Sequence, residues 1–259
     1  MKKVSNLNKD SFNTFNGKSY RFISFKGLEN TINNESLRYS RIDSFNDPLD
    51  CSPYLSPNFI GQKPIPDRFL KNWRDKNFMK YFGRMYVCCF CKEYNSLDSY
   101  LMWSHYSEKH TQACFEIDFS TNNYNGNPSE VLYPDDLCKK RELMKTRNAH
   151  DFGIYYMTTK LNIWKYEKEV RLIYDKSYKK HIVNKIFNCD KKHVCLPFDP
   201  KIITKIIFGY NANADDEKKI ISLVKKKGMQ VVFEKMIIDP SDIKLKAIPY
   251  DDYHKFLLS

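Results

Sequence analysis

The run MYVCCFC, residues 85–91, predicts a buried β-strand because its side chains are apolar throughout. Helices are expected on both sides of it, from Asp67 to Phe82 and from Asn95 through the sequence LMWSHY. Strand candidates recur along the chain without a helix between each pair, which favours an α+β fold over a doubly wound one. These candidates are Ser19–Phe25, Leu37–Arg41, Gln112–Asp118, Tyr166–Tyr174, His181–Phe187, His193–Phe198, Ile203–Phe208, Val231–Phe233 and Ile243–Ile248.

The whole pattern predicts one α+β domain over residues 1–259, with a mixed central sheet flanked by helices. A chain of this length can bury a substantial core. Within it, residues 200–259 are expected to form a β-α-β subregion, in which the helix Asp215–Lys227 connects two strands and Gly228 caps it. No GxGxxG or Walker loop occurs, which excludes the standard nucleotide cradles.

The composition is basic, with 43 Lys and Arg against 31 Asp and Glu and a formal net charge of +12. Such a surplus favours a polyanionic partner through long-range attraction. The alternative is a compositional bias toward lysine, asparagine and isoleucine. The lysines lie in scattered pairs, and no arginine-rich stripe with interleaved aromatic residues is visible. A nucleic acid therefore stays one candidate partner beside a protein.

The sequence predicts a cytoplasmic protein that does not enter a membrane. Its start, MKKVSNLNKDSFN, has positive charge but lacks the apolar stretch of a secretory signal. No apolar run approaches the ~20 residues of a spanning helix. An intracellular chain of this length needs no disulfide framework from its eight cysteines. Cys88 and Cys91 have CxxC spacing but lack the second pair that zinc requires, so no metal is expected.

Three short constellations carry the candidate chemistry, and the first is FNDP, residues 45–48. Asp47 precedes a proline, which pushes its backbone toward an extended conformation. The side chains of Asn46 and Asp47 can each bond to nearby backbone amides and fix a turn. The tetrapeptide is therefore either a rigid loop beside a pocket or a loop with a structural role alone.

The second constellation is LMWSHY, residues 101–106, with His110 one turn later. On a helix, Trp103, Tyr106 and His110 would share one stripe. Such a stripe could stack on a flat ligand and offer polar groups to it. The alternative is a core stripe with satisfied polar ends, which is the commoner role of aromatic residues.

The third constellation is WKYEKEVRL, residues 164–172. On a strand, Glu167, Glu169 and Arg171 would share one face, with the two carboxylates about 7 Å apart. Neighbouring carboxylates perturb each other's ionisation, which suits a reaction that develops positive charge or must orient a hydroxyl. The alternatives are an exposed polar face, or a helical pair between Glu167 and Arg171.

Taken together, these segments resemble a bacterial family of unknown activity, in order and spacing, from residue 20 to about residue 210. Family members often have a second basic residue where Ile23 stands, a glutamate where Asp50 stands and a glycine where Gln112 stands. The matching motifs are an aromatic-basic strand at Tyr20-Arg21-Phe22, the loop Ser44–Pro48, the strand Cys89-Phe90-Cys91, the helix Leu101–Tyr106 with His110, and the WxxExExR strand Trp164–Arg171.

The order of these roles is also similar to that of ADP-ribosyltransferase-like enzymes, which implies an NAD-consuming transferase or glycohydrolase with NAD as its substrate. Because members of the bacterial family are often met near mobile elements and defence genes, a toxin or anti-phage defence effector is expected. Glu169 would stabilise the oxocarbenium-like state and Glu167 would steer the acceptor, which is a protein or a nucleic acid. The expected NAD-binding residues are Tyr20, Arg21, Asn46, Asp47, Trp103, His105, Tyr106 and Arg171.

A second hypothesis belongs to another class, namely a defence effector that binds or cleaves nucleic acid and never uses NAD. Its support is the net charge of +12 together with the acidic and histidine side chains of the three constellations. A third hypothesis is that these polar groups only brace the fold of a sensor. The three differ in whether the aromatic helix and the glutamate pair line one site.

Overall fold

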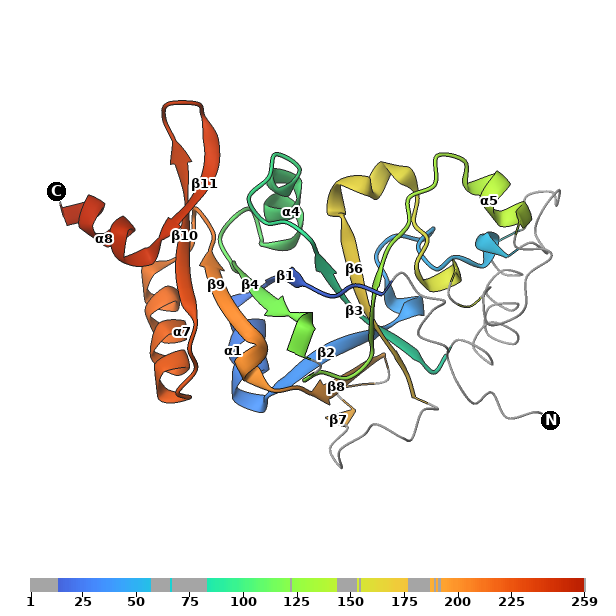
Figure 1. The fold of residues 1–259 in the computed structure, drawn as a ribbon, viewed down its shortest axis with the longest axis horizontal. Helices are drawn as coiled ribbons and strands as arrows, with labels where there is room; N and C mark the ends of the chain where they lie inside the picture. Colours follow the sequence, from blue (N-terminus) through green and yellow to red (C-terminus); the bar gives the residue numbers. More distant parts are fainter. Residues whose placement is uncertain are drawn as a thin grey trace.

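The strand β3 (Met85–Cys91) lies at the centre of one large sheet, as its apolar sequence predicts (Figure 1). One edge of β3 pairs antiparallel with β6 (Glu169–Asp175) along its whole length. The other edge is shared by β1 (Lys18–Ile23) and β2 (Ser36–Arg41), which pair with opposite ends of β3. The sheet therefore forks at β3. The computed structural model describes residues 14–56, 66, 83–121, 123–143, 153, 155–176, 187–188, 190 and 192–258.

One arm of the fork continues from β1 through β4 (Ala113–Asp118) and β9 (Ile203–Phe208). It ends with β10 (Val232–Asp239) and the hairpin strand β11 (Lys244–Pro249). The strands β9 and β10 run parallel, with α7 (Ala214–Lys226) between them in the chain. This is the β-α-β unit that the tail pattern predicts.

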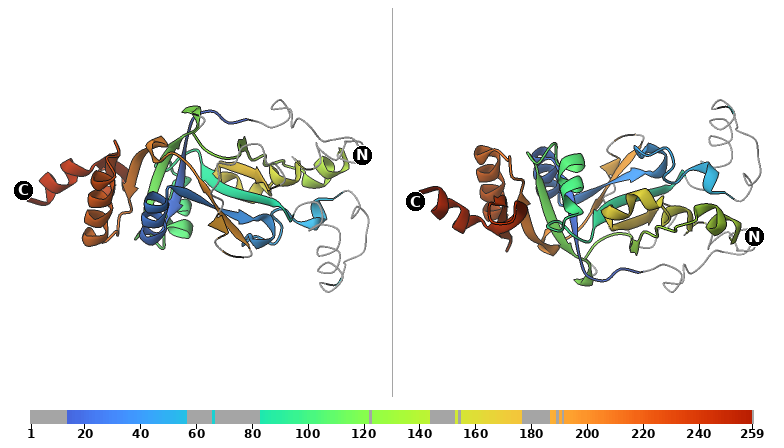
Figure 2. Two further views of the ribbon diagram at one scale, coloured as in Figure 1. Left: turned by 90° about the horizontal axis from the view of Figure 1, so that it is seen from below. Right: turned by 90° about the horizontal axis from the view of Figure 1, so that it is seen from above.

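The other arm continues from β2 through β8 (His193–Pro197) to the short β7 (Phe187–Asn188). The strand β6 carries a further partner, β5 (Asn127–Glu130), on its free edge. The sheet is thus mixed and carries helices on both faces, which makes the protein an α+β fold. The terminal helix α8 (Tyr250–Leu258) and α5 (Leu137–Leu143) lie towards opposite ends of the long axis (Figure 2).

The helices divide between the two faces of the sheet. Alternate residues of β4 point to opposite faces, and Phe115 packs with α1 (Phe25–Asn34) and α7 in the largest buried cluster. The neighbouring Cys114 instead packs with Trp103 of α4 (Ser99–Tyr106). Therefore α4 covers the face of the sheet that α1 and α7 leave open.

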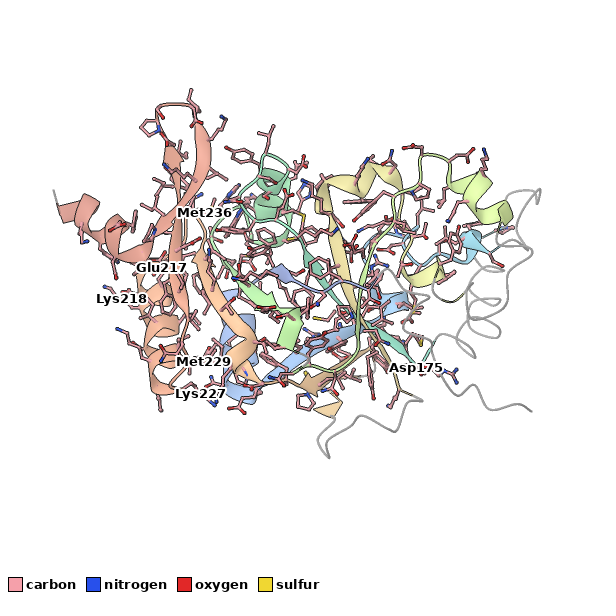
Figure 3. All side chains as sticks on the ribbon, viewed as in Figure 1. Asp175, Glu217, Lys218, Lys227, Met229 and Met236 are labelled. Carbon is pink, nitrogen blue, oxygen red and sulfur yellow. The ribbon has the colours of Figure 1, made fainter. Side chains whose placement is uncertain are left out.

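A buried ion pair fixes α7 to the edge of the sheet. The Lys235 ammonium donates to Glu217 Oε1 at 2.6 Å and to the carbonyl of Gly209 at 2.8 Å. The Tyr250 hydroxyl donates to the other oxygen of Glu217 at 2.8 Å, so α8 is bound to the same carboxylate. Figure 3 shows Glu217 on α7, between that helix and β10.

Several helices and strands begin at other residues than the sequence predicts. The expected strand at Tyr166–Tyr174 begins only at Glu169, because Asn162–Glu167 forms a 3-10 helix, η8, and Lys168 has a left-handed φ of 42°. The helix expected from Asn95 begins at Ser99. The strand β5 and the helices η8 and α8 were not predicted. The helix expected at Asp67–Phe82 lies outside the described residues, as does His181–Phe187 apart from its last residue.

One cysteine is disulfide-bonded, although the sequence was expected to need no disulfide framework. Cys195 on β8 is disulfide-bonded, whereas the other described cysteines, six in number, are free thiols. Among the described residues, no three His, Cys, Asp or Glu side chains are grouped so as to hold a metal ion. None of the helices within the described ranges is long and apolar enough to cross a bilayer.

Candidate functional site

Arg171 of β6 is the centre of a buried charge network. Its Nε and Nη2 donate to the two carboxylate oxygens of Glu169, at 2.9 and 3.0 Å. Its Nη2 also reaches Asp50 Oδ2 at 2.5 Å, and its Nη1 donates to the carbonyl of Met157 at 2.9 Å. The guanidinium is fully buried and lies 5.2 Å from the ring centre of Phe45. Planar pairing of this kind holds the Glu169 carboxylate in one orientation.

Lys160 is the second cation of the network, and it lies among three carboxylates. Its Nζ is 2.5 Å from Glu167 Oε2 and 3.6 Å from both Asp50 Oδ2 and Glu169 Oε2. Three carboxylates thus face two buried cations. The second oxygen of Asp50, Oδ1, is buried without a hydrogen-bond partner in the described part of the chain. The network therefore holds one negative charge in excess, unless one acid keeps its proton.

The pKa values of the two glutamates are shifted in opposite directions. Burial raises the pKa of Glu169, but the charges of Arg171 and Lys160 and the hydrogen bonds from Arg171 and Cys89 lower it to about 2. Burial also raises the pKa of Glu167, and the nearby charge of Glu169 raises it further. Lys160 and Tyr106 offset only part of that rise. Neighbouring carboxyls with opposite shifts are the pattern of acid and base roles in one site.

Tyr106 joins the aromatic helix to this network. Its hydroxyl donates to Glu167 Oε1 at 2.7 Å, and Tyr106 as a whole is 37% exposed. The last residue of α4 and the last residue of η8 are therefore in direct contact, although 61 positions separate them. Burial and the charge of Glu167 both raise the pKa of the phenol, which keeps it a donor.

Trp103 does not share this location, although it was expected among the NAD-binding residues. Its indole is fully buried, donates to the carbonyl of Tyr94 at 2.7 Å and meets the ring of Phe22 edge-on at 4.9 Å. The helix ends at Tyr106, so His110 is not on it, yet the imidazole stacks on Trp103 with an angle of 11°. Trp103 and His110 therefore support the fold of α4 rather than line the acidic network.

The expected residues of β1 also lie away from the glutamates. Arg21 bonds to the thiol of Cys88 and to the carbonyl of Arg38. Cys89, the neighbour of Cys88, pairs with Arg171, so Arg21 and Arg171 point to opposite faces of the sheet. Tyr20 points to the same face as Arg171, but its hydroxyl donates to Glu116 at 2.7 Å. Strand alternation at β1 therefore places Arg21, which was expected to bind NAD, on the face of the sheet opposite to the glutamates.

The FNDP loop borders the network without contacting Glu167. Asp47 Oδ1 accepts the backbone N–H of Leu49 at 2.8 Å, which fixes the turn as its sequence predicts. That turn holds Phe45 beside the guanidinium and brings Asp50 into the buried pair. Asn46 is exposed. Asp50 follows the loop at a position where members of the resembled family often have a glutamate.

Two other members of the site carried no sequence signal. Lys160 lies in a segment that held no motif, and Tyr133 accepts the backbone N–H of Glu169 at 2.9 Å. His105 was expected to bind the cofactor, and its Nδ1 lies 3.4 Å from the hydroxyl of Tyr166. The expected residues that meet in one place are thus Glu167, Glu169, Arg171, Tyr106 and His105.

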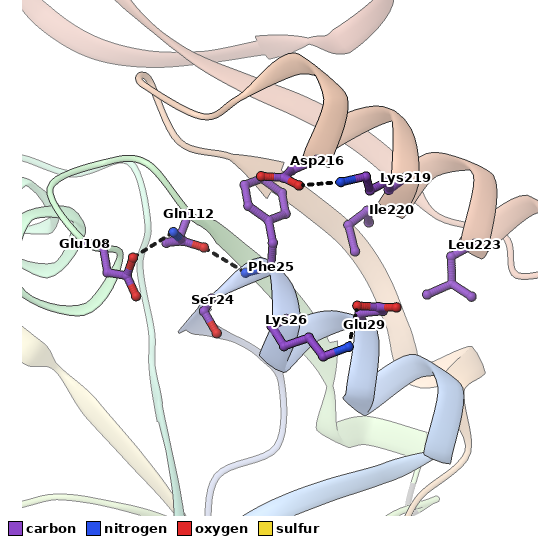
Figure 4. Close-up of a pocket in the computed structure, with 10 residues that line it drawn as sticks. All are labelled: Ser24, Phe25, Lys26, Glu29, Glu108, Gln112, Asp216, Lys219, Ile220 and Leu223. Carbon is purple, nitrogen blue, oxygen red and sulfur yellow. Dashed lines mark hydrogen bonds and ion pairs between the residues drawn. The ribbon is translucent and has the colours of Figure 1, made fainter.

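Two of the hollows in the described part of the structure can be compared with the position of the glutamates. A small one of about 110 Å³ is lined by Leu49, Ser52 and Leu161, which are sequence neighbours of Asp50 and Lys160, together with Tyr54, Leu55, Leu137 and Cys138. It is too small for a whole dinucleotide. The larger, of about 630 Å³, lies between α1 and α7, on the other face of the sheet (Figure 4). Neither is lined by the two glutamates.

No family model, no curated protein and no solved structure matches this chain.

Proposed function

We propose that this protein is an NAD-consuming enzyme of the ADP-ribosyltransferase type, with Glu167 as its catalytic carboxylate. The observation that carries the proposal is the buried network around Glu167, in which three carboxylates face two cations. An excess negative charge in a site of low dielectric favours a reaction whose transition state gains positive charge. Cleavage of a nicotinamide glycosidic bond passes through such an oxocarbenium-like state.

In the proposed reaction, the bond between ribose C1′ and the nicotinamide nitrogen breaks, and nicotinamide leaves with the electron pair. A hydroxyl group of water or of an acceptor then adds to C1′, and its proton passes to Glu167. The raised pKa of Glu167 suits a base that must accept this proton. Its two oxygens contact Tyr106 and Lys160, which hold the carboxylate in one orientation.

The roles of the two glutamates differ from those expected from the sequence. Glu169 was the first choice for stabilising the oxocarbenium, but both of its oxygens already accept bonds from Arg171. Its charge is therefore largely neutralised. In the proposal, Glu169 and Arg171 are positioning residues that fix Lys160 and the end of η8, and Glu167 takes the catalytic role.

The acceptor is water, a protein or a nucleic acid, and the proposal extends to a toxin or defence effector that depletes NAD. The net charge of +12 favours a nucleic acid, either as the acceptor or as the partner of an effector that does not use NAD. That second function would show itself as RNA or DNA binding that weakens steeply with salt, without a thermal shift on addition of NAD.

The test is nicotinamide release from NAD by the wild-type protein and by Glu167→Gln, with Glu93→Gln as the control. Glu93 also pairs with a lysine, Lys168 at 2.7 Å, but it lies outside the buried network. We expect Glu167→Gln to lower the rate at least a hundredfold and Glu93→Gln to leave it unchanged. Wild-type turnover by Glu167→Gln would overturn the assignment, and a wild-type protein that releases no nicotinamide would overturn the reaction.

A further inference from the structure

A continuous row of four rings borders Glu167, and we call it the aromatic rim: His105, Tyr106, Trp164 and Tyr166. The ring centres of Trp164 and Tyr166 are 6.0 Å apart, those of Tyr166 and His105 6.3 Å, and those of His105 and Tyr106 6.2 Å. The row begins over Lys160 and ends at the hydroxyl that bonds to Glu167. Lys160 also bonds to Glu167, so the two ends of the row are connected through this carboxylate.

The aromatic rim is not part of the hydrophobic core. None of its four rings belongs to the buried clusters formed by the described residues. Trp164 and Tyr166 are half-buried, and His105 and Tyr106 are exposed. The 3-10 geometry of η8 places two large rings at the surface where the charge network ends. Exposed aromatic groups beside a polar site are the groups on which flat ligands stack.

Lys160 restricts which flat ligand Trp164 can accept. Its ammonium lies over the indole, 4.9 Å from the ring centre, and so already uses the negative face of that ring. A second cation stacked on Trp164 would be attracted more weakly, because the π electrons of the ring are already polarised toward Lys160. A neutral heterocycle does not meet that opposition and gains the usual stacking energy. The charge around Trp164 therefore selects neutral bases over cationic ones.

We infer that the aromatic rim binds a neutral heterocyclic base by stacking on Trp164, and that this base is the adenine of an adenine nucleotide. The inference rests on the proposed NAD chemistry for the identity of the nucleotide, since NAD carries one neutral and one cationic base. The adenine would lie at Trp164, and the cationic nicotinamide would lie nearer to Tyr106 and the carboxylate of Glu167. The rim thereby sets the direction in which the dinucleotide enters the site.

The test is a titration of the wild-type protein with AMP and, separately, with nicotinamide mononucleotide, while tryptophan fluorescence is recorded. We expect AMP to quench the signal saturably and nicotinamide mononucleotide to quench it at least tenfold more weakly. The chain has three tryptophans, so the same titration of Trp164→Phe identifies the source of the signal. Stronger quenching by nicotinamide mononucleotide, or an undiminished AMP response in Trp164→Phe, would overturn the inference.

Affinity supplies a second measurement that does not depend on fluorescence. Trp164→Ala should weaken AMP binding about tenfold in calorimetry, as expected for loss of one base stack. Ile163→Ala is the matched control, since Ile163 is 76% exposed on the same 3-10 helix and lies outside the rim. Equal losses in the two variants would contradict the role of Trp164.

These binding measurements need no turnover, so they separate the inference from the proposed reaction. AMP binding at Trp164 without nicotinamide release would leave the rim assignment standing and remove the reaction. Nicotinamide release without AMP binding would leave the reaction standing and remove the assignment of the rim. Salt-sensitive binding of a short oligo(dT) at Trp164, in the absence of AMP binding, would assign the rim to single-stranded nucleic acid and overturn the inference.

Discussion

The hydroxyl of Tyr106 donates to a carboxylate oxygen of Glu167 at 2.7 Å, which joins the ends of α4 and η8 across 61 positions of sequence. This contact places an exposed phenol and a buried acid in one site. The Trp103 ring, one turn earlier on α4, is turned into the core instead. The chemistry proposed for the protein therefore depends on the last residue of the helix rather than on its most conspicuous aromatic residue.

Tyr106→Phe should lower nicotinamide release about ten- to a hundredfold, because it removes a hydrogen bond to a charged group while keeping the ring. Since that bond lowers the pKa of Glu167, its loss should also move the acidic limb of the pH–rate profile to higher pH. The control is Tyr100→Phe, on the same helix, whose hydroxyl accepts the backbone N–H of Leu245 instead. An unchanged profile in Tyr106→Phe would contradict the coupling.

Arg171→Met should lower the free energy of unfolding by about 3–5 kcal/mol, because it leaves Glu169 and Asp50 buried without their main cation. Urea denaturation followed by circular dichroism measures this quantity. The matched variant is Arg38→Met, whose 3.5 Å pair with Asp190 is exposed and should contribute below about 1 kcal/mol. Similar losses in both variants would show that the buried network is not the source of stability.

The free energy of unfolding should fall at acid pH because Glu169 becomes protonated. The pKa of this acid is about 2 in the folded protein, below its ordinary value of 4.5, so the folded state favours the ionised form. The contribution is present above pH 4.5 and is lost as the pH falls toward 2. The raised pKa of Glu167 acts in the opposite sense and favours the folded state at low pH.

Urea denaturation of the wild-type protein and of Glu169→Gln between pH 7 and pH 2.5 tests this expectation. The difference in unfolding free energy should be largest near neutral pH and should shrink as the pH approaches 2. Glu29→Gln, which removes an exposed pair with Lys26, should give a small difference at every pH. A constant gap between wild type and Glu169→Gln would count against the low pKa.

Gly209→Ala should destabilise the protein by about 1–3 kcal/mol, because a Cβ at that position would meet the backbone oxygens of His110 and Gln112. The segment it would displace follows Tyr106 and contains three consecutive residues with positive φ, Glu108 to His110. Turnover should therefore fall together with thermal stability. Gly17→Ala, which meets only the side chain of Phe15 at 3.4 Å, serves as the control in differential scanning fluorimetry.

The sequence predicted the strands in which most side chains are apolar. MYVCCFC at β3 and the sequence ITKIIF at β9 carry enough burial to determine their own structure. The helix α7 was also predicted, since its apolar stripe and the glycine that follows it, Gly228, are both local signals. Elements such as β5 and η8 were missed because their structure depends on partners that are distant in the chain.

The candidate site was predicted only in part. Glu167, Glu169 and Arg171 do come together, but only Glu169 and Arg171 do so by strand alternation on β6, since Glu167 ends the 3-10 helix and Lys168 after it has a left-handed backbone. Lys160 joins these residues through tertiary contacts alone, and no local pattern marks it. The expected contact from Arg21 failed because its strand presents that side chain to the opposite face.

The fork at β3 has a consequence during synthesis of the chain. Three strands satisfy the edges of β3, and the one that covers an entire edge, β6, lies between residues 169 and 175. At ribosomal speeds of about 5–20 residues per second, residues 85–91 leave the ribosome roughly 4 to 17 s before that partner. β1 and β2 precede β3 in the chain and pair with its other edge, so only the edge that β6 covers lacks its partner during this interval. An unpaired strand edge is a template for aggregation. The edge of β3 that β6 covers is therefore open to wrong pairing until residue 175 has been made.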